Sequence, residues 1–156
     1  MERRKFLGLG AGLFAATIIP ASLTAANFRE TKPEAWKVMN NKEDNMDGTN
    51  AAIKAIFGTD KVEEGKVKLK APDIAENGAV IPITASTEKA SKIAIFQSAN
   101  PESAVAVFDI PANGIPDYSI RIKMQKTGTV TAVAEIDGKL YKASKVVKVT
   151  IGGCGG

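Results

Sequence analysis

The stretch TVTAVAEI-DG-KLYKASKVVKVTI, residues 129–151, carries the strongest fold signal in the chain. Residues 129–136 and 139–151 are rich in valine, isoleucine and threonine, which favour strands. Asp137-Gly138 separates the two segments, and this dipeptide between strand-like runs is a strong signal for a two-residue hairpin turn. The stretch therefore predicts two long antiparallel strands joined by a tight turn.

Five shorter segments upstream also have the composition or the period-two alternation of strands. They are residues 66–70, 80–85, 92–97, 104–110 and 118–124. Turn-forming residues lie between them, at Pro72-Asp73, Glu76-Asn77-Gly78, Asn100-Pro101 and Asn113-Gly114. Seven short strands at this spacing predict an all-β fold, an immunoglobulin-like antiparallel β-sandwich.

A short helical extension is expected ahead of the sandwich, within residues 33–57. Pro33 suits the first position of a helix. Trp36 can share one apolar face of that helix with Val38 and Met39.

The polar residues 40–48 should interrupt this helical pattern. Thr49 is then expected to cap a second short helix, and Gly58 to end it. Trp36 and Phe57 are interpreted as core anchors and not as a ligand-binding box, because core burial is the usual role of apolar residues at helical spacing.

The composition describes one ordinary globular domain and excludes several kinds of chemistry. The chain has 156 residues and a net charge of +4, about half of which comes from residues 1–26. The rest is too balanced to favour nucleic acid as a partner. Histidine is absent and there is one cysteine, so a positioned imidazole, an internal disulfide and a cysteine-rich metal site are excluded. We therefore expect no cofactor and no metal.

Residues 1–26 have the pattern of a bacterial export signal. Arg3-Arg4 is a twin-arginine pair, residues 7–19 are mildly apolar, and small residues end the segment at Ala26. The apolar run is short for a membrane span. We expect cleavage after Ala26 and a periplasmic mature protein without a membrane anchor, the alternative being an uncleaved amphipathic anchor.

The chain ends in Gly152-Gly153-Cys154-Gly155-Gly156, directly after the last predicted strand. Glycine has no Cβ, so residues 152–156 are expected to form a thin, flexible tail, with Cys154 roughly 10 Å beyond the folded body when extended. Glycines at a chain end cannot build a core around a cysteine, so a buried structural role for Cys154 is disfavoured. Three interpretations remain, namely an unimportant frayed terminus, a reactive thiol and an intermolecular disulfide. We favour a reactive thiol. Without a neighbouring base it is a poor stand-alone catalyst but a suitable attachment point.

The tail also carries a family resemblance. The ending VTIGGCGG resembles the terminal motif of SoxY proteins, and a twin-arginine signal accompanies it. Three upstream runs are similar to the same family, residues 122–124, 130–133 and 137–141. The resemblance implies a SoxY-like domain over residues 27–151 and a carrier arm over residues 152–156.

The resemblance to SoxY also implies a function. Cys154 would carry sulfur intermediates of thiosulfate oxidation covalently, as a thiosulfonate or persulfide, while the four glycines supply reach and clearance. The protein would be a carrier and not an enzyme. Its partners would be SoxZ in a heterodimer and, transiently, a c-type haem enzyme, a sulfate-releasing hydrolase and a sulfur dehydrogenase or other sulfur acceptor.

Three other classes of function compete with the carrier. A ubiquitin-like sulfur donor also ends in glycines, but the cysteine and the export signal argue against it. A thiol oxidoreductase is disfavoured because the chain has no Cys-x-x-Cys motif. An exported interaction module whose Cys154 forms an intermolecular disulfide remains the main alternative.

Overall fold

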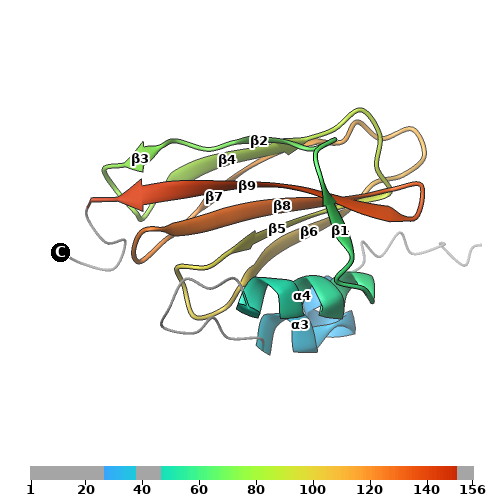
Figure 1. The fold of residues 1–156 in the computed structure, drawn as a ribbon, viewed down its shortest axis with the longest axis horizontal. Helices are drawn as coiled ribbons and strands as arrows, with labels where there is room; N and C mark the ends of the chain where they lie inside the picture. Colours follow the sequence, from blue (N-terminus) through green and yellow to red (C-terminus); the bar gives the residue numbers. More distant parts are fainter. Residues whose placement is uncertain (1–26, 38–46, 151–156) are drawn as a thin grey trace, which may run out of the picture.

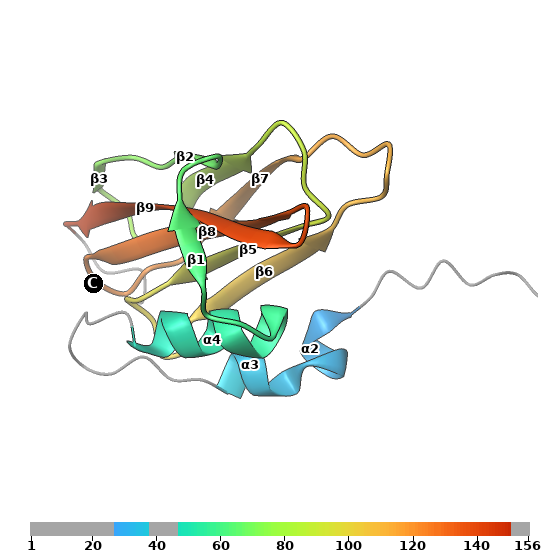
Figure 2. The same ribbon diagram turned by 45° about the vertical axis from the view of Figure 1, so that its right-hand side comes forward.

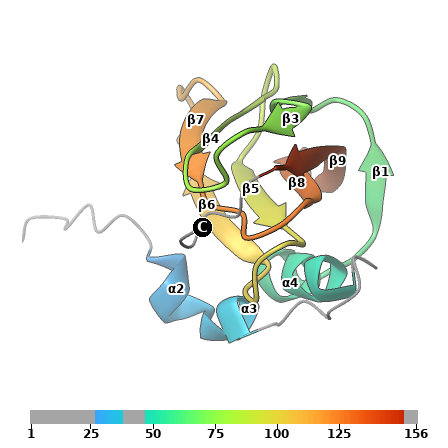
Figure 3. The same cartoon turned by 90° about the vertical axis from the view of Figure 1, so that its left-hand side faces the viewer.

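Two β-sheets face each other across a shared core in the computed structural model, which describes residues 27–37 and 47–150 (Figure 1). The larger sheet has the order β1-β9-β8-β5-β6, with β3 also paired to β9. Its strands are β1 (Val62–Glu64), β3 (Ile74–Ala75), β5 (Lys92–Gln97), β6 (Ala104–Asp109), β8 (Gly128–Ile136) and β9 (Lys139–Val149). The smaller sheet has the order β2-β4-β7, with strands β2 (Lys68–Lys70), β4 (Ile81–Ser86) and β7 (Asp117–Ile122). Figure 3 shows the two sheets end on.

The predicted all-β, immunoglobulin-like sandwich is confirmed, and each of the seven predicted segments contains a strand. Asp137 and Gly138 both have positive φ, 51° and 75°, as the predicted hairpin turn requires. The pairing of Ile136 with Lys139 closes that hairpin. The prediction was incomplete in one respect, because the two short strands β1 and β3 pair with β9 in parallel.

The main core lies between the sheets. It contains fully buried side chains from both layers, including Ile83, Ile95, Met124, Val130 and Val147. The central strands β5 and β8 are buried on nearly their whole length. This happens because their outer faces are also covered, so a second core forms on the other side of the larger sheet.

Three helices supply that cover, α2 (Phe28–Thr31), α3 (Pro33–Lys37) and α4 (Asp47–Phe57). Figure 2 shows α3 and α4 beside the larger sheet. Trp36 and Ile53 pack with Phe96 and Leu140 of the sheet, so Trp36 is a core anchor as predicted. Gly58, with φ of 78°, donates its backbone N–H to Lys54 O at 2.8 Å and ends α4 as expected.

The prediction for Thr49 was wrong. Helix α4 begins at Asp47, so Thr49 lies inside the helix and residues 47 and 48 do not interrupt it. The Thr49 hydroxyl is buried and shares a hydrogen bond of 3.0 Å with Ser103 Oγ. Its polar group therefore joins the helix to the segment before β6 instead of capping the helix.

Other predictions fall outside the described residues. These are the export signal of residues 1–26, the apolar pair Val38 and Met39, and the tail of residues 152–156. Within residues 27–37 and 47–150, no helix is long and apolar enough to cross a membrane.

Candidate functional site

The predicted site residues are Cys154 and the four glycines of residues 152–156, and they lie outside the described residues. The structure describes the chain as far as Thr150. Residues 148–150, called the arm root from here on, therefore show how the folded body presents the segment that follows.

Strand β3 holds one side of the arm root. Lys148 N donates to Asp73 O at 2.9 Å, and Thr150 N donates to Ala75 O at 3.1 Å. The Thr150 hydroxyl donates to Glu76 O at 3.3 Å. These bonds continue the parallel pairing of β3 with β9, so the chain is fixed to the body up to its last described residue.

The loop before β8 holds the other side. Val149 N donates to Thr127 Oγ1 at 3.0 Å. The adjacent Gly128 lies close to the loop after β5, since a Cβ at Gly128 would come within 2.8 Å of Ala99 Cβ and 3.0 Å of Ser98 Oγ. A glycine is needed there because any larger residue would force these segments apart.

The lysines close to the arm root differ in their surroundings. Lys145 Nζ donates to Ala71 O at 2.6 Å and forms an ion pair with Asp73 Oδ1 at 3.0 Å. Lys148 is exposed on the other face of β9. The positive charge of Lys145 is therefore balanced locally by a carboxylate, and Lys148 is the more accessible cation.

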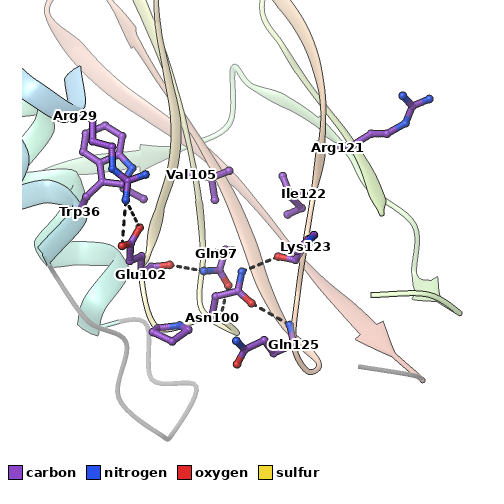
Figure 4. Close-up of a pocket in the computed structure, with 12 residues that line it drawn as sticks. Arg29, Trp36, Gln97, Asn100, Glu102, Val105, Arg121, Ile122, Lys123 and Gln125 are labelled. Atoms are coloured by element: carbon purple, nitrogen blue, oxygen red, sulfur yellow. Dashed lines mark hydrogen bonds and ion pairs between the residues drawn. The ribbon is translucent and has the colours of Figure 1, made fainter. Parts of the chain in front are cut away.

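A cavity of about 540 Å³ opens at the same end of the sandwich (Figure 4). It lies between helices α2 and α3 and the edge formed by β6 and β7. Its lining residues are Arg29, Trp36, Gln97, Asn100, Pro101, Glu102, Ala104, Val105, Arg121, Ile122, Lys123 and Gln125. The cavity neighbours the arm root, because Gln125 is two residues before Thr127.

Amide side chains fix one wall of the cavity (Figure 4). Asn100 Nδ2 donates to Lys123 O at 2.7 Å, and Asn100 Oδ1 accepts from Gln125 N at 2.9 Å. Gln97 Oε1 accepts from Asn100 N at 2.7 Å, while Gln97 Nε2 donates to Glu102 O. The bonds tie the β5–β6 loop to the β7–β8 loop.

The sequence analysis missed this amide cluster, since it assigned Asn100-Pro101 to a turn alone. One available signal was Gln97, a polar residue that closes the otherwise apolar segment IAIF and is buried in the structure. Arg29 also lines the cavity. Its guanidinium forms an ion pair with the Glu102 carboxylate at 3.0 Å, so this positive charge is balanced locally. No group of three acidic, histidine or cysteine residues that could hold a metal ion occurs in the part of the chain that the structure describes.

Lys66, at the opposite end of the sandwich, has a raised pKa. Lys66 Nζ lies 4.1 Å from the centre of the Tyr141 ring and donates to its hydroxyl at 2.9 Å. This hydrogen bond raises the pKa of Lys66 above its usual 10.5. Lys66 therefore stays charged throughout the neutral range.

The two-sheet sandwich belongs to the immunoglobulin-like class of folds. Comparisons with known proteins identify the family of the chain within that class. The family model for sulfur oxidation protein SoxY matches residues 53–154. The solved structure of the sulfur carrier protein SoxY from Chlorobium limicola f thiosulfatophilum is 42% identical, covers 66% of this chain and 96% of its own, and has a TM-score of 0.61. The chain belongs to the SoxY family and has a role in sulfur oxidation.

More distant structures share the fold alone. A superoxide reductase (neelaredoxin) from Ignicoccus hospitalis is 17% identical and covers 55% of this chain and 80% of its own, with a TM-score of 0.50. No curated protein matches the chain.

Proposed function

We propose that Cys154 carries sulfur intermediates covalently and presents them to partner enzymes. The observation that carries this proposal is the family match, which runs from residue 53 to residue 154 and so includes the cysteine. The solved relative is named as a sulfur carrier protein. The anchored arm root supports the same role, because a carrier needs a firm body from which its attachment point extends.

The proposed loading step joins thiosulfate to the cysteine. The Cys154 thiol loses its proton, a sulfur–sulfur bond forms to the outer sulfur of thiosulfate, and two electrons pass to a c-type haem enzyme. The product is a cysteine S-thiosulfonate. A hydrolase then adds water and breaks the bond between the sulfone group and the neighbouring sulfur, which releases sulfate and one proton and leaves a protonated persulfide, S–SH, on Cys154.

The length of the arm is consistent with a carrier whose cysteine reaches into the active sites of separate enzymes. Cys154 is four residues beyond Thr150, so an extended chain places it at most about 13 Å from the arm root. The flanking Gly152, Gly153, Gly155 and Gly156 add no side chains that would block a narrow active-site channel. The carrier is therefore acted upon by enzymes and is not itself the catalyst.

The proposed partners follow from the family. SoxZ forms a heterodimer with this chain, and the haem enzyme, the hydrolase and a sulfur dehydrogenase or other acceptor bind in turn. The proposed carrier itself binds no nucleic acid and no cofactor. Co-purification from the native source tests the heterodimer, and a monomer that fails to recruit SoxZ at micromolar concentration would count against it.

The proposed location is the periplasm, reached by the twin-arginine route. The mature chain should begin at Asn27 and lack residues 1–26. Replacing Arg3 and Arg4 with lysine should hold the precursor in the cytoplasm. Periplasmic molecules that keep Met1 would contradict this proposal.

The carrier role itself is tested with Cys154→Ser in a system reconstituted from SoxZ and the loading enzyme. A hydroxyl cannot form the required sulfur–sulfur bond, so the variant should take up no thiosulfate-derived sulfur. Uptake by Cys154→Ser would disprove the proposal. The competing interaction module predicts instead a stable disulfide-linked dimer on a non-reducing gel.

A further inference from the structure

The exposed large apolar side chains are unevenly distributed over the described residues. Four stand out, namely Ile74 at 57% exposure, Val80 at 54%, Val146 at 53% and Ile115 at 81%. Isolated residues of this kind are normal on a protein surface. Ile74 on β3, Val80 just before β4 and Val146 on β9, however, lie on segments that adjoin the arm root. Figure 1 shows β3 and the end of β9 together at the left-hand end of the molecule.

Ile74 and Val146 share one face of the larger sheet. Ile74 on β3 is paired with Lys148 on β9, and Val146 is two residues before Lys148, so all three point the same way. Their neighbours Ala75 and Val149 face the core instead. Ile74 and Val146 are thus diagonal neighbours on this face.

Val80 follows the turn that connects β3 to β4. The turn is held firmly, because Gly78 O accepts a hydrogen bond from Met124 N at 2.8 Å and Val80 N donates to Asn77 O. The same connection binds the arm root, since Glu76 O accepts from the Thr150 hydroxyl. Val80 thus lies at the end of the β3–β4 connection, which flanks the arm root.

We propose that Ile74, Val80 and Val146 form an apolar collar on which the sulfate-releasing hydrolase that processes Cys154 docks. This inference rests on the proposed carrier function. The arm allows Cys154 a reach of about 13 Å from Thr150, so an active site that receives the cysteine must open within that distance. The surface around such an opening then lies against the collar.

The collar also indicates the chemistry of the docking enzyme. Its apolar side chains fit an active-site entrance rimmed by apolar residues. Lys148 is exposed on the same face as Ile74 and Val146, and it favours a carboxylate on that rim. Asp73 adds no net charge beside the collar because it is paired with Lys145.

Ile115 provides a matched control. It lies between β6 and β7, whose adjoining ends Asp109 and Asp117 pair with Lys92 and Ser86, at the opposite end of the sandwich. It is more exposed than any collar residue but lies away from the arm root. Losing it should therefore change apolar surface without changing docking.

The experiment compares Ile74→Ser/Val146→Ser with Ile115→Ser, each in the full SoxZ heterodimer, as substrates of the purified sulfate-releasing hydrolase after loading with thiosulfate. From the apolar surface lost, we expect KM for the carrier to rise roughly 10- to 100-fold with kcat little changed. The control should match the wild type. Val80→Ser, on the other segment, should raise KM in the same direction.

Two results would overturn the proposed collar. An unchanged KM for both the double variant and Val80→Ser would overturn the collar. Loss of SoxZ binding in sedimentation would also overturn it, because the collar would then be a subunit interface. Thermal unfolding and labelling of Cys154 by a small thiol reagent should be unaffected in all variants. If the wild-type protein takes up no sulfur, the carrier function fails, which is distinct from a failure of the collar.

Discussion

Replacing Thr49 with valine keeps the shape of the side chain and removes one hydroxyl group from a buried position. In the structure this hydroxyl shares a hydrogen bond of 3.0 Å with Ser103 Oγ, and both residues are fully buried. The bond connects helix α4 to the segment that leads into β6. Thr49→Val therefore tests whether the helical layer is joined to the sheet at this point.

The expected loss follows from the group left behind. A buried hydroxyl without a partner costs roughly 1–3 kcal/mol of stability. For a domain of this size that corresponds to a fall in Tm of roughly 4–10 °C. Removing both hydroxyls in Thr49→Val/Ser103→Ala leaves no such group, so the double variant should be more stable than the sum of the single effects predicts.

The assay is thermal and urea unfolding of four proteins, the wild type, the two single variants and the double variant. Thr49→Asp extends the series. If Thr49 were an N-cap, aspartate would be tolerated, because it is a good capping residue. At a buried position inside the helix, aspartate should instead be the most damaging change in the series.

Two results would refute this reasoning. One is a Thr49→Val protein as stable as the wild type. The other is strict additivity of the two single effects, within about 0.5 kcal/mol, which would mean that the hydroxyls do not interact.

Two further predictions concern the arm and a surface lysine. Valine at both Gly152 and Gly153 should lower turnover by the partner enzymes while a small thiol reagent still labels Cys154, because a thicker, stiffer segment enters a channel less easily; unchanged turnover would remove the steric explanation. The hydrogen bond between Lys66 and Tyr141 raises the pKa of Lys66 above 10.5, so its stabilising effect is complete below pH 10.5 and is lost as the pH rises through the raised value. The difference in stability between wild type and Lys66→Met should thus be constant from pH 6 to about pH 9 and shrink above 10.5, and a difference that already shrinks below pH 9 in chemical denaturation would contradict it.

The fold could be predicted to a large extent because its signals are local. Asp137-Gly138 fixes the hairpin through the positive φ angles that this turn demands. The alternation in residues 118–122 and the composition of residues 92–97 mark strands without reference to any partner.

The missed parts depend on contacts between distant segments. Strand β1 has three residues and β3 has two, and both exist because β9 lies alongside them. Such short strands leave no periodic pattern in the sequence. Thr49 was misassigned for a related reason, since a threonine near a helix start is usually a cap and only the packed structure places Ser103 opposite it.

The site likewise has one part that the sequence predicts and one part that depends on contacts between distant segments. Cys154 and its glycines are a pattern within five residues, so the sequence suffices to predict a carrier arm, which stays a prediction. The collar is different, because Ile74 and Val146 are far apart in the chain and each is an ordinary strand residue by composition. The register of β3 against β9 brings them together.

The intact mass of the mature protein, purified from its native source and measured before and after a reducing agent, tests the carrier role most directly. The account predicts molecules heavier than the chain beginning at Asn27 by one thiosulfonate group or one sulfur atom, and a return to the unmodified mass after reduction. Cys154→Ser, prepared in the same way, should have the unmodified mass throughout. A native protein found entirely at the unmodified mass during growth on thiosulfate, or entirely as a disulfide-linked dimer, would contradict the account.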